Sequence, residues 1–157
     1  MHDADIDQFW MAHALSLAAQ AAEAGEAPIG AVIIDPETNT IVAHAHNQPI
    51  SDHDPSSHAE LLAIRRAGVA LGNYRLKKGL TLYVTLEPCT MCAGAISQAR
   101  IARLVFGAPD VKGGAVTNGV RFFDQPTCHH RPLVTKGILA EESATMLRAF
   151  FQARRKA

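Results

Sequence analysis

Lysine and arginine are absent from the first sixty residues of this 157-residue chain, which contain ten acidic residues. All fifteen basic residues follow, from Arg65 onward, with only five acids among them. The two parts therefore carry formal charges of −10 and +10, and the whole chain carries zero. A total of zero argues against a strongly basic nucleic-acid binder, but the uneven distribution allows a positive face that meets an anion.

Long apolar runs and cysteines are also scarce. No run approaches the ~18 residues that a membrane span needs, and the start of the chain is acidic where a secretory signal would be basic. We therefore expect a cytoplasmic protein with no membrane association. Three cysteines are too few, and odd in number, for a disulfide framework, whereas the pair Cys89-x-x-Cys92 is more typical of metal or redox chemistry.

The composition is that of one compact domain. Hydrophobic residues make up 48% of the chain and charged residues 19%, which excludes disorder. We expect a single domain over residues 1–157. Its elements should be a helix over 6–25, strands over 29–34 and 41–46, a polar loop over 49–57, a helix from 59 to about 72, a strand over 80–86, a helix over 88–100, a strand over 102–107, a long loop over 108–132, an extended piece over 133–135 and a helix over 140–155.

The alternation of strands and helices predicts an α/β layer fold with some parallel strand pairing. Right-handed crossovers would place the two middle helices on one face of the sheet. Asp5 and Asp7 are candidates for capping the first helix. The loop over 108–132 is long for a compact domain, and loops of this length are more often functional than not.

Cys89 and Cys92 open the third predicted helix directly after a strand. Cysteines at i and i+3 share a helix face, and the positive end of the helix favours thiolates there. Two thiolates cannot complete a zinc site, so a further ligand must come from elsewhere in the chain. His58, which opens the second predicted helix, is a good candidate because two helix starts can converge over the ends of neighbouring strands.

Glu60 follows His58 by two residues. Within a helix that spacing would put the two side chains on nearly opposite faces, so both can approach one metal only if His58 stands at the helix entrance. The metal would then lie beyond the helix ends, near the loops. A carboxylate there that is not a ligand can shuttle protons for a zinc-activated water.

Other interpretations of these residues stay open. A lone Cys-x-x-Cys can be a redox pair or a coincidence, and His-x-Glu alone carries almost no information. Further metal ligands are available in His44, His46, Cys128, His129 and His130, and a fourth protein ligand would indicate a structural zinc. The combination of His58, Glu60, Cys89 and Cys92 favours a catalytic site, because it is the pattern of the zinc nucleobase deaminases.

With this pattern in view, the chain resembles the cytidine/deoxycytidylate deaminase superfamily and, within it, the bacterial tRNA-specific adenosine deaminases. The resemblance implies a three-layer α/β/α fold with a central mixed sheet of about five strands flanked by helices. It also implies one Zn2+ per subunit and a homodimer. The segments that carry it are 27–32, 53–60, 73–76, 81–94, 103–108, 137–142 and 150–155.

The same resemblance implies roles for individual residues. His58, Cys89 and Cys92 would bind zinc, and Glu60 would carry protons while a zinc-activated water attacks carbon 6 of a flipped-out adenine. The product would be inosine at the first anticodon position of a tRNA, namely an arginine tRNA. The candidate substrate-binding residues are Asn47, His53, Asp110, Lys112, Phe150, Phe151 and Arg154, to which the long loop adds His129.

The chain departs from the family pattern in its loops. Gln48 stands where the family commonly has arginine, Thr117-Asn118-Gly119-Val120 replaces a Gly-Ser-Leu segment, and His129-His130-Arg131 replaces Asn-His-Arg. These loops would read the nucleotides that flank the target base. The departures therefore put the recognition of sequence context in doubt rather than the deamination.

Two other functions remain possible at this stage. One is a free-base deaminase of the guanine or cytosine type, and the other is a non-catalytic, zinc-stabilised RNA-binding module, which Glu60 disfavours. The last helix is equally ambiguous, because Phe150 and Phe151 can serve the core instead of RNA. Its basic residues, Arg148, Arg154, Arg155 and Lys156, can simply be solvated.

Overall fold

A five-stranded mixed sheet forms the centre of the protein. The computed structural model describes residues 3–156, so Met1, His2 and Ala157 of the predicted domain lie outside the described residues. The strand order is β2-β1-β3-β4-β5, with β1 antiparallel to both β2 and β3, and with β3, β4 and β5 parallel. The strands are β1 (Gly30–Asp35), β2 (Thr40–His46), β3 (Thr81–Leu86), β4 (Arg103–Ala108) and β5 (Leu133–Lys136).

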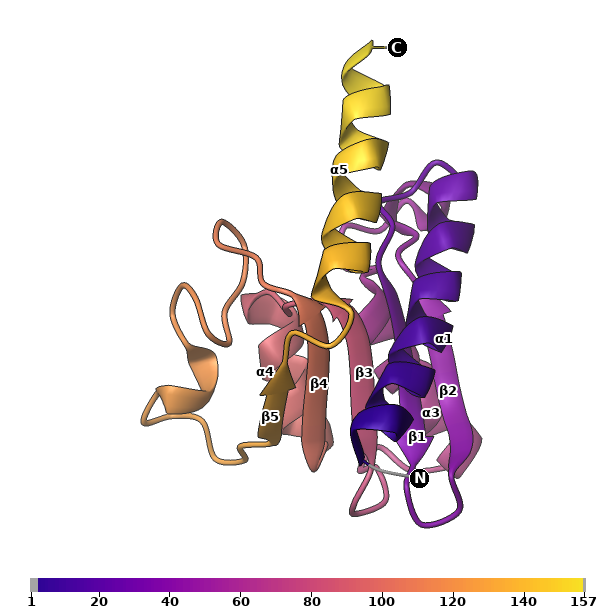
Figure 1. Cartoon of the computed structure of the whole chain (residues 1–157). Helices are drawn as coiled ribbons and strands as arrows, with labels where there is room; N and C mark the ends of the chain where they lie inside the picture. The colour runs from indigo at the N-terminus through magenta and orange to yellow at the C-terminus, as the bar shows by residue number, and fades with distance from the viewer. Residues whose placement is uncertain (1–2, 157) are drawn as a thin grey trace.

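Helices cover both faces of this sheet. Helices α1 (Asp3–Glu23) and α5 (Ala140–Lys156) lie on one face, and α3 (Ala59–Leu71) and α4 (Thr90–Ala99) lie on the other (Figure 1). The predicted three-layer α/β/α architecture is therefore confirmed. The two middle helices share one face because each connects two parallel strands by a crossover of the same hand: α3 joins β2 to β3 across β1, and α4 joins β3 to β4. Within residues 3–156, no helix combines the length and the apolar character that a membrane crossing requires.

Successive side chains of strand β1 point alternately into two hydrophobic cores. Ala31 and Ile33 face the larger core beneath α3 and α4, and Val32 and Ile34 face the smaller core beneath α1. Gly30 begins this strand where α1 crosses it so closely that a Cβ atom would collide with the backbone of Ala14. Burial on both faces explains why β1 consists of apolar residues without alternation.

Three local expectations need correction. The predicted polar loop over 49–57 contains a short helix, α2 (Pro49–Asp52), and the predicted loop over 108–132 contains a single 3-10 turn, η1 (Phe122–Asp124). Two features explain α2. Proline stands at its first position, and the N–H of the next residue, Ile50, donates to the carboxylate of Glu26. The third predicted helix begins at Thr90 rather than Pro88, with Cys89 as its N-cap residue.

Asp7 does not cap α1, contrary to expectation. It lies inside the helix, is buried, and accepts two hydrogen bonds from the guanidinium of Arg103 at 2.8 and 2.7 Å and one from the hydroxyl of Tyr83 at 2.8 Å. Burial alone would raise the pKa of the Asp7 carboxyl, but these donors outweigh it and hold the pKa below its ordinary value. The pair therefore fastens α1 to the start of β4.

The two oppositely charged parts of the sequence neutralise each other across the fold. Within residues 3–156, each ion pair joins an acid from the first sixty residues to a base from the remainder. Lys77 contacts Asp35 at 2.7 Å and Glu37 at 3.2 Å. The other two pairs are Arg65–Asp54 and Arg103–Asp7. Ion pairs within the molecule therefore neutralise part of the charge imbalance along the sequence.

Candidate metal centre and substrate pocket

Two helices begin at the edge of the sheet where β3 ends, and their first residues meet. His58 is the N-cap residue of α3 and Cys89 is the N-cap residue of α4, and both have extended backbone. Cys92 lies in the first turn of α4 and is fully buried. His58 thus stands at the helix entrance, which is the position that its spacing from Glu60 requires.

The geometry of these three side chains fits a tetrahedral metal. Nδ1 of His58 lies 3.6 Å from Sγ of Cys89 and 3.6 Å from Sγ of Cys92. A zinc ion with Zn–S of about 2.3 Å and Zn–N of about 2.0 Å would hold such atoms about 3.5 Å apart. Among residues 3–156, no other group of three histidine, cysteine or acidic side chains is close enough to share an ion. The rival ligands around Cys128 and His44 are therefore outside this cluster.

The two cysteine thiols influence each other's ionisation. Hydrogen bonds with the Cys92 thiol and with His58 lower the pKa of the Cys89 thiol to about 4, although burial alone would raise it. The same hydrogen bond, together with burial, raises the pKa of Cys92. A divalent cation bound between the two sulfur atoms would favour the thiolate form of both.

Glu60 is buried beside this cluster. It lies in the first turn of α3, and burial raises the pKa of its carboxyl to about 7. A carboxyl with such a pKa can both accept and release a proton near neutral pH. It lines a cavity of about 320 Å³, the small end of the range for ligand pockets, together with Asn47, His58, Cys89 and Asp110.

Asn47 shapes the wall of this cavity and is itself buried. Its Oδ1 accepts a hydrogen bond of 2.8 Å from the backbone N–H of Ala59, which satisfies one of the free amide groups at the start of α3. Because the oxygen is engaged, only the NH2 group of Asn47 is left for a ligand. The side chain thus offers hydrogen-bond donors at a fixed position.

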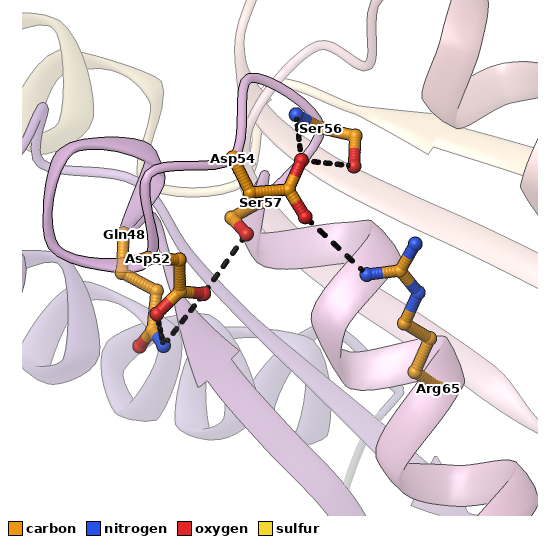
Figure 2. A network of polar contacts seen from close by, with 6 residues as sticks. All are labelled: Gln48, Asp52, Asp54, Ser56, Ser57 and Arg65. Carbon is orange, nitrogen blue, oxygen red and sulfur yellow. Dashed lines mark hydrogen bonds and ion pairs between the residues drawn. The ribbon is translucent and has the colours of Figure 1, made fainter.

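The loop before His58 is held by its own polar side chains (Figure 2). Nε2 of Gln48 donates to both carboxylate oxygens of Asp52, at 3.0 and 3.1 Å, and the hydroxyl of Ser57 donates to the same carboxylate at 2.9 Å. Gln48 therefore contacts the loop itself. Asp54 accepts from the N–H and hydroxyl of Ser56, and its other oxygen faces Arg65 at 3.9 Å.

Two buried glutamates that sequence reasoning missed hold the loops around the cavity. Glu26 accepts from the N–H groups of Ile50 and Ser51, at 3.1 and 2.8 Å, at the start of α2. Glu87 accepts from the backbone after β4 and lines the cavity. The single sequence signal for Glu87 is an acid at the end of a buried strand, directly before the Pro88-Cys89 turn.

The remaining predicted substrate residues lie outside the cavity. His53, at the C-terminal end of α2, is exposed and has left-handed backbone with φ of 51°, and Lys112 and His129 are exposed in the long loop. On α5, whose second half extends beyond the body of the protein, Phe151 is exposed (Figure 1). The guanidinium of Arg154 lies 4.9 Å from the ring centroid of Phe150 and donates to the carbonyl of Gly25.

Comparison with known proteins gives a consistent set of similarities. Residues 4–108 match the family described as the cytidine and deoxycytidylate deaminase zinc-binding region. The tRNA-specific adenosine deaminase of Agrobacterium fabrum is 53% identical over 93% of this chain and 94% of its own, and that of Haemophilus influenzae is 49% identical over 97% of this chain and 87% of its own.

A solved structure from a study of A-to-I editing by tRNA:A34 deaminases at the wobble position of transfer RNA is also similar. It is 53% identical in sequence, superposes with a TM-score of 0.84, and the match covers 87% of this chain and 97% of that one.

The metal cluster generates a test that needs no substrate. We expect the purified protein to bind one Zn2+ per chain, and cobalt(II) in its place to give the absorption of thiolate-to-metal charge transfer. Cys89→Ser should abolish that band and reduce bound metal at least tenfold, because two protein ligands hold a divalent ion poorly. Cys128→Ser is the matched control and should bind one metal. Full metal content in Cys89→Ser would contradict the assignment.

Proposed function

The chain belongs to the cytidine and deoxycytidylate deaminases and, among them, to the tRNA-specific adenosine deaminases, and we propose that it converts the wobble adenosine of a tRNA to inosine. The observation that carries the proposal is the cluster of His58, Cys89 and Cys92 with the buried carboxyl of Glu60 beside it. The resemblance of the sequence to the bacterial enzymes supports an arginine tRNA as the substrate. A tRNA substrate would place the protein in the cytoplasm.

The chemistry is a hydrolysis in which adenine and water give hypoxanthine and ammonia. A zinc ion held by His58, Cys89 and Cys92 supplies a Lewis acid that lowers the pKa of water to about 7. Glu60 takes a proton from the attacking water and delivers it to ring nitrogen 1. It then takes the second proton, from the hydroxyl that carbon 6 has gained, and delivers it to the exocyclic amine, which leaves as ammonia while the carbonyl of hypoxanthine forms. Its raised pKa suits both transfers, because the carboxyl must be regenerated as a base after each turnover.

The cavity walls orient the base for this attack. The free NH2 group of Asn47 can donate to an acceptor on the ring edge, and its position is fixed by the hydrogen bond with Ala59. A cavity of about 320 Å³ has room for one nucleobase, so the adenine must leave the base stack of the RNA to enter it. An RNA loop lowers that cost, because its bases are already partly unstacked.

A free-base deaminase is the alternative, and it has weaker support. The tRNA-specific relatives from Haemophilus influenzae and Agrobacterium fabrum each match more than nine-tenths of this chain, at 49% and 53% identity. The two substrates can be separated in one assay, since only the RNA product retains its ribose and phosphates.

We expect the protein to form inosine on an anticodon stem-loop that carries a wobble adenosine, and to release little ammonia from free adenine, guanine or cytosine. Glu60→Gln should lower turnover at least 10²-fold, because general acid–base catalysis typically contributes 10²- to 10⁴-fold, while bound zinc is retained. Mass spectrometry of digested RNA measures the product. Deamination of a free base without deamination of the stem-loop would overturn the proposal, and an active Glu60→Gln protein would overturn the role of Glu60.

We also propose that the exposed part of α5 and the neighbouring loops contact the RNA. Phe151 is 47% exposed, and Arg148, Arg154 and Arg155 are exposed on the same helix. An exposed ring can stack on a base, and exposed guanidinium groups can neutralise phosphates. His53 and Lys112 are exposed on loops and can extend the same surface. His129 is exposed beside His130, whose ring contacts the carbonyl of Ile101, at the opposite end of β4 from Lys112.

Neutralising the α5 arginines should therefore weaken RNA binding and reduce its salt dependence. Each phosphate contact on single-stranded RNA contributes about 0.7 to the steepness of log K against log salt. For Arg148→Gln/Arg154→Gln/Arg155→Gln, which would remove three contacts, we therefore expect the slope to become shallower by about 2. The control Lys77→Gln/Lys78→Gln removes two positive charges beside Asp35, the last residue of β1. It should leave the slope unchanged. Filter binding at several salt concentrations measures it, and an equal slope in both variants would refute the contact.

We propose further that the protein is a homodimer through the face formed by α3 and α4. Val69 and Tyr74 are each 85% exposed there, and a surface cavity of about 290 Å³ lies between Tyr74 and Gln98. Light scattering should give a mass of roughly twice 16.8 kDa. Val69→Asp should shift the protein toward monomer, while Leu133→Asp on β5, which is exposed to a similar degree, should not. A monomeric wild-type protein would contradict the proposal.

A further inference from the structure

The carboxylate of Glu87 is surrounded by the loop that follows β4. Its Oε2 accepts from the backbone N–H groups of Val116, Thr117 and Asn118 at 3.0, 2.9 and 3.1 Å. Its Oε1 accepts from the backbone N–H of Asp110 at 3.0 Å and from Nδ2 of Asn118 at 2.7 Å. Five donors on one buried carboxylate hold the pKa of Glu87 below its ordinary value, although burial alone would raise it.

The loop is built to enclose this carboxylate closely. A Cβ atom at Gly114 would lie 2.5 Å from both the carbonyl oxygen of Asp110 and Cδ of Glu87, so only glycine fits between them. The N–H of Ala115 donates to the carbonyl of Pro88 at 2.9 Å, which ties the loop to the turn that leads into Cys89. The path of the loop is thus set by Glu87.

Asp110 connects this arrangement to the cavity. It lines the pocket, and its Oδ1 accepts from the N–H groups of Lys112 and Gly113 at 3.2 and 3.0 Å, which leaves Oδ2 for a ligand. Its backbone N–H shares Oε1 of Glu87 with the side chain of Asn118. A change at Asn118 therefore acts on the same oxygen atom that fixes Asp110.

Of the five donors to Glu87, only Nδ2 of Asn118 belongs to a side chain. The other four are backbone amides, which persist when side chains are exchanged. Asn118 also stands in the segment where this chain departs from the Gly-Ser-Leu pattern, and its side chain contacts Glu87 instead of being free to read a flanking nucleotide. Its contribution can therefore be removed without removing the rest of the arrangement.

We propose that Asn118 is a positioning residue, which acts through Glu87 to hold Asp110 and the following turn at the mouth of the substrate pocket. The inference rests on the proposed deamination of an RNA adenosine in this pocket. It assigns the Asn118 side chain to the alignment of the substrate rather than to contact with it. The metal cluster is not involved, so bound zinc should be insensitive to the residue at position 118.

Two variants test the proposal on the stem-loop substrate. Asn118→Ala loses one hydrogen bond and should raise KM roughly 2- to 10-fold with kcat nearly unchanged. Asn118→Asp places a carboxylate against Glu87 and should lower kcat/KM roughly 10- to 100-fold. Asn39→Asp is the matched control, because its Oδ1 accepts from Trp10 Nε1 and an aspartate retains that bond.

Hydrogen exchange of the same proteins separates this inference from the proposed function. The amides of residues 110–118 should exchange at least tenfold faster in Asn118→Asp than in the wild type or in Asn39→Asp, at equal zinc content. Unchanged exchange or a wild-type kcat/KM in Asn118→Asp would overturn the positioning role. If the wild-type protein deaminates no RNA, the proposed function is refuted. Faster exchange in Asn118→Asp would then still show that Asn118 holds the loop, but not that this affects catalysis.

Discussion

The site depends on two helix N-termini that face each other at one edge of the sheet. A cap residue has extended backbone, so its side chain can project beyond the helix end, and this is how His58 reaches within 3.6 Å of the Cys89 sulfur. The unpaired amide groups of both first turns add positive potential at the same place, which favours thiolates and a nearby carboxylate. The crossovers of the fold bring these two ends together, so that the ligands come from the residue before each helix and from the first turn of α4.

Buried carboxylates give the loops around this site a fixed shape. Glu26 holds the loop before His58 and Glu87 holds the loop after β4, each by accepting backbone N–H groups that would otherwise lack partners. A carboxylate with several such donors stays ionised even when buried, and its hydrogen bonds are stronger than neutral ones. The pocket is therefore preformed, which suits an enzyme whose substrate must pay the cost of leaving its base stack.

The sequence predicts those features of the molecule that depend on spacing. The helix, strand and crossover pattern is local, and His58, Cys89 and Cys92 stand at fixed distances from helix starts. The roles of Glu26 and Glu87 could not be predicted, because a carboxylate that binds backbone amides 23 to 31 positions away leaves no pattern in side-chain identities. For the same reason, the inward orientation of Gln48 could be seen only in the folded loop.

The ion pairs that join the early acids to the late bases have a consequence for how the protein is made. Asp7, Asp35 and Asp54 have no positive partner until Arg65, Lys77 and Arg103 have been synthesised. At about 5 to 20 residues per second, the ribosome adds the stretch from Glu60 to Arg103 in roughly 2 to 9 s. Over that interval the growing chain remains negatively charged while β3 is added to the hairpin, and the balance of charge is reached only when the last basic residues of α5 are added.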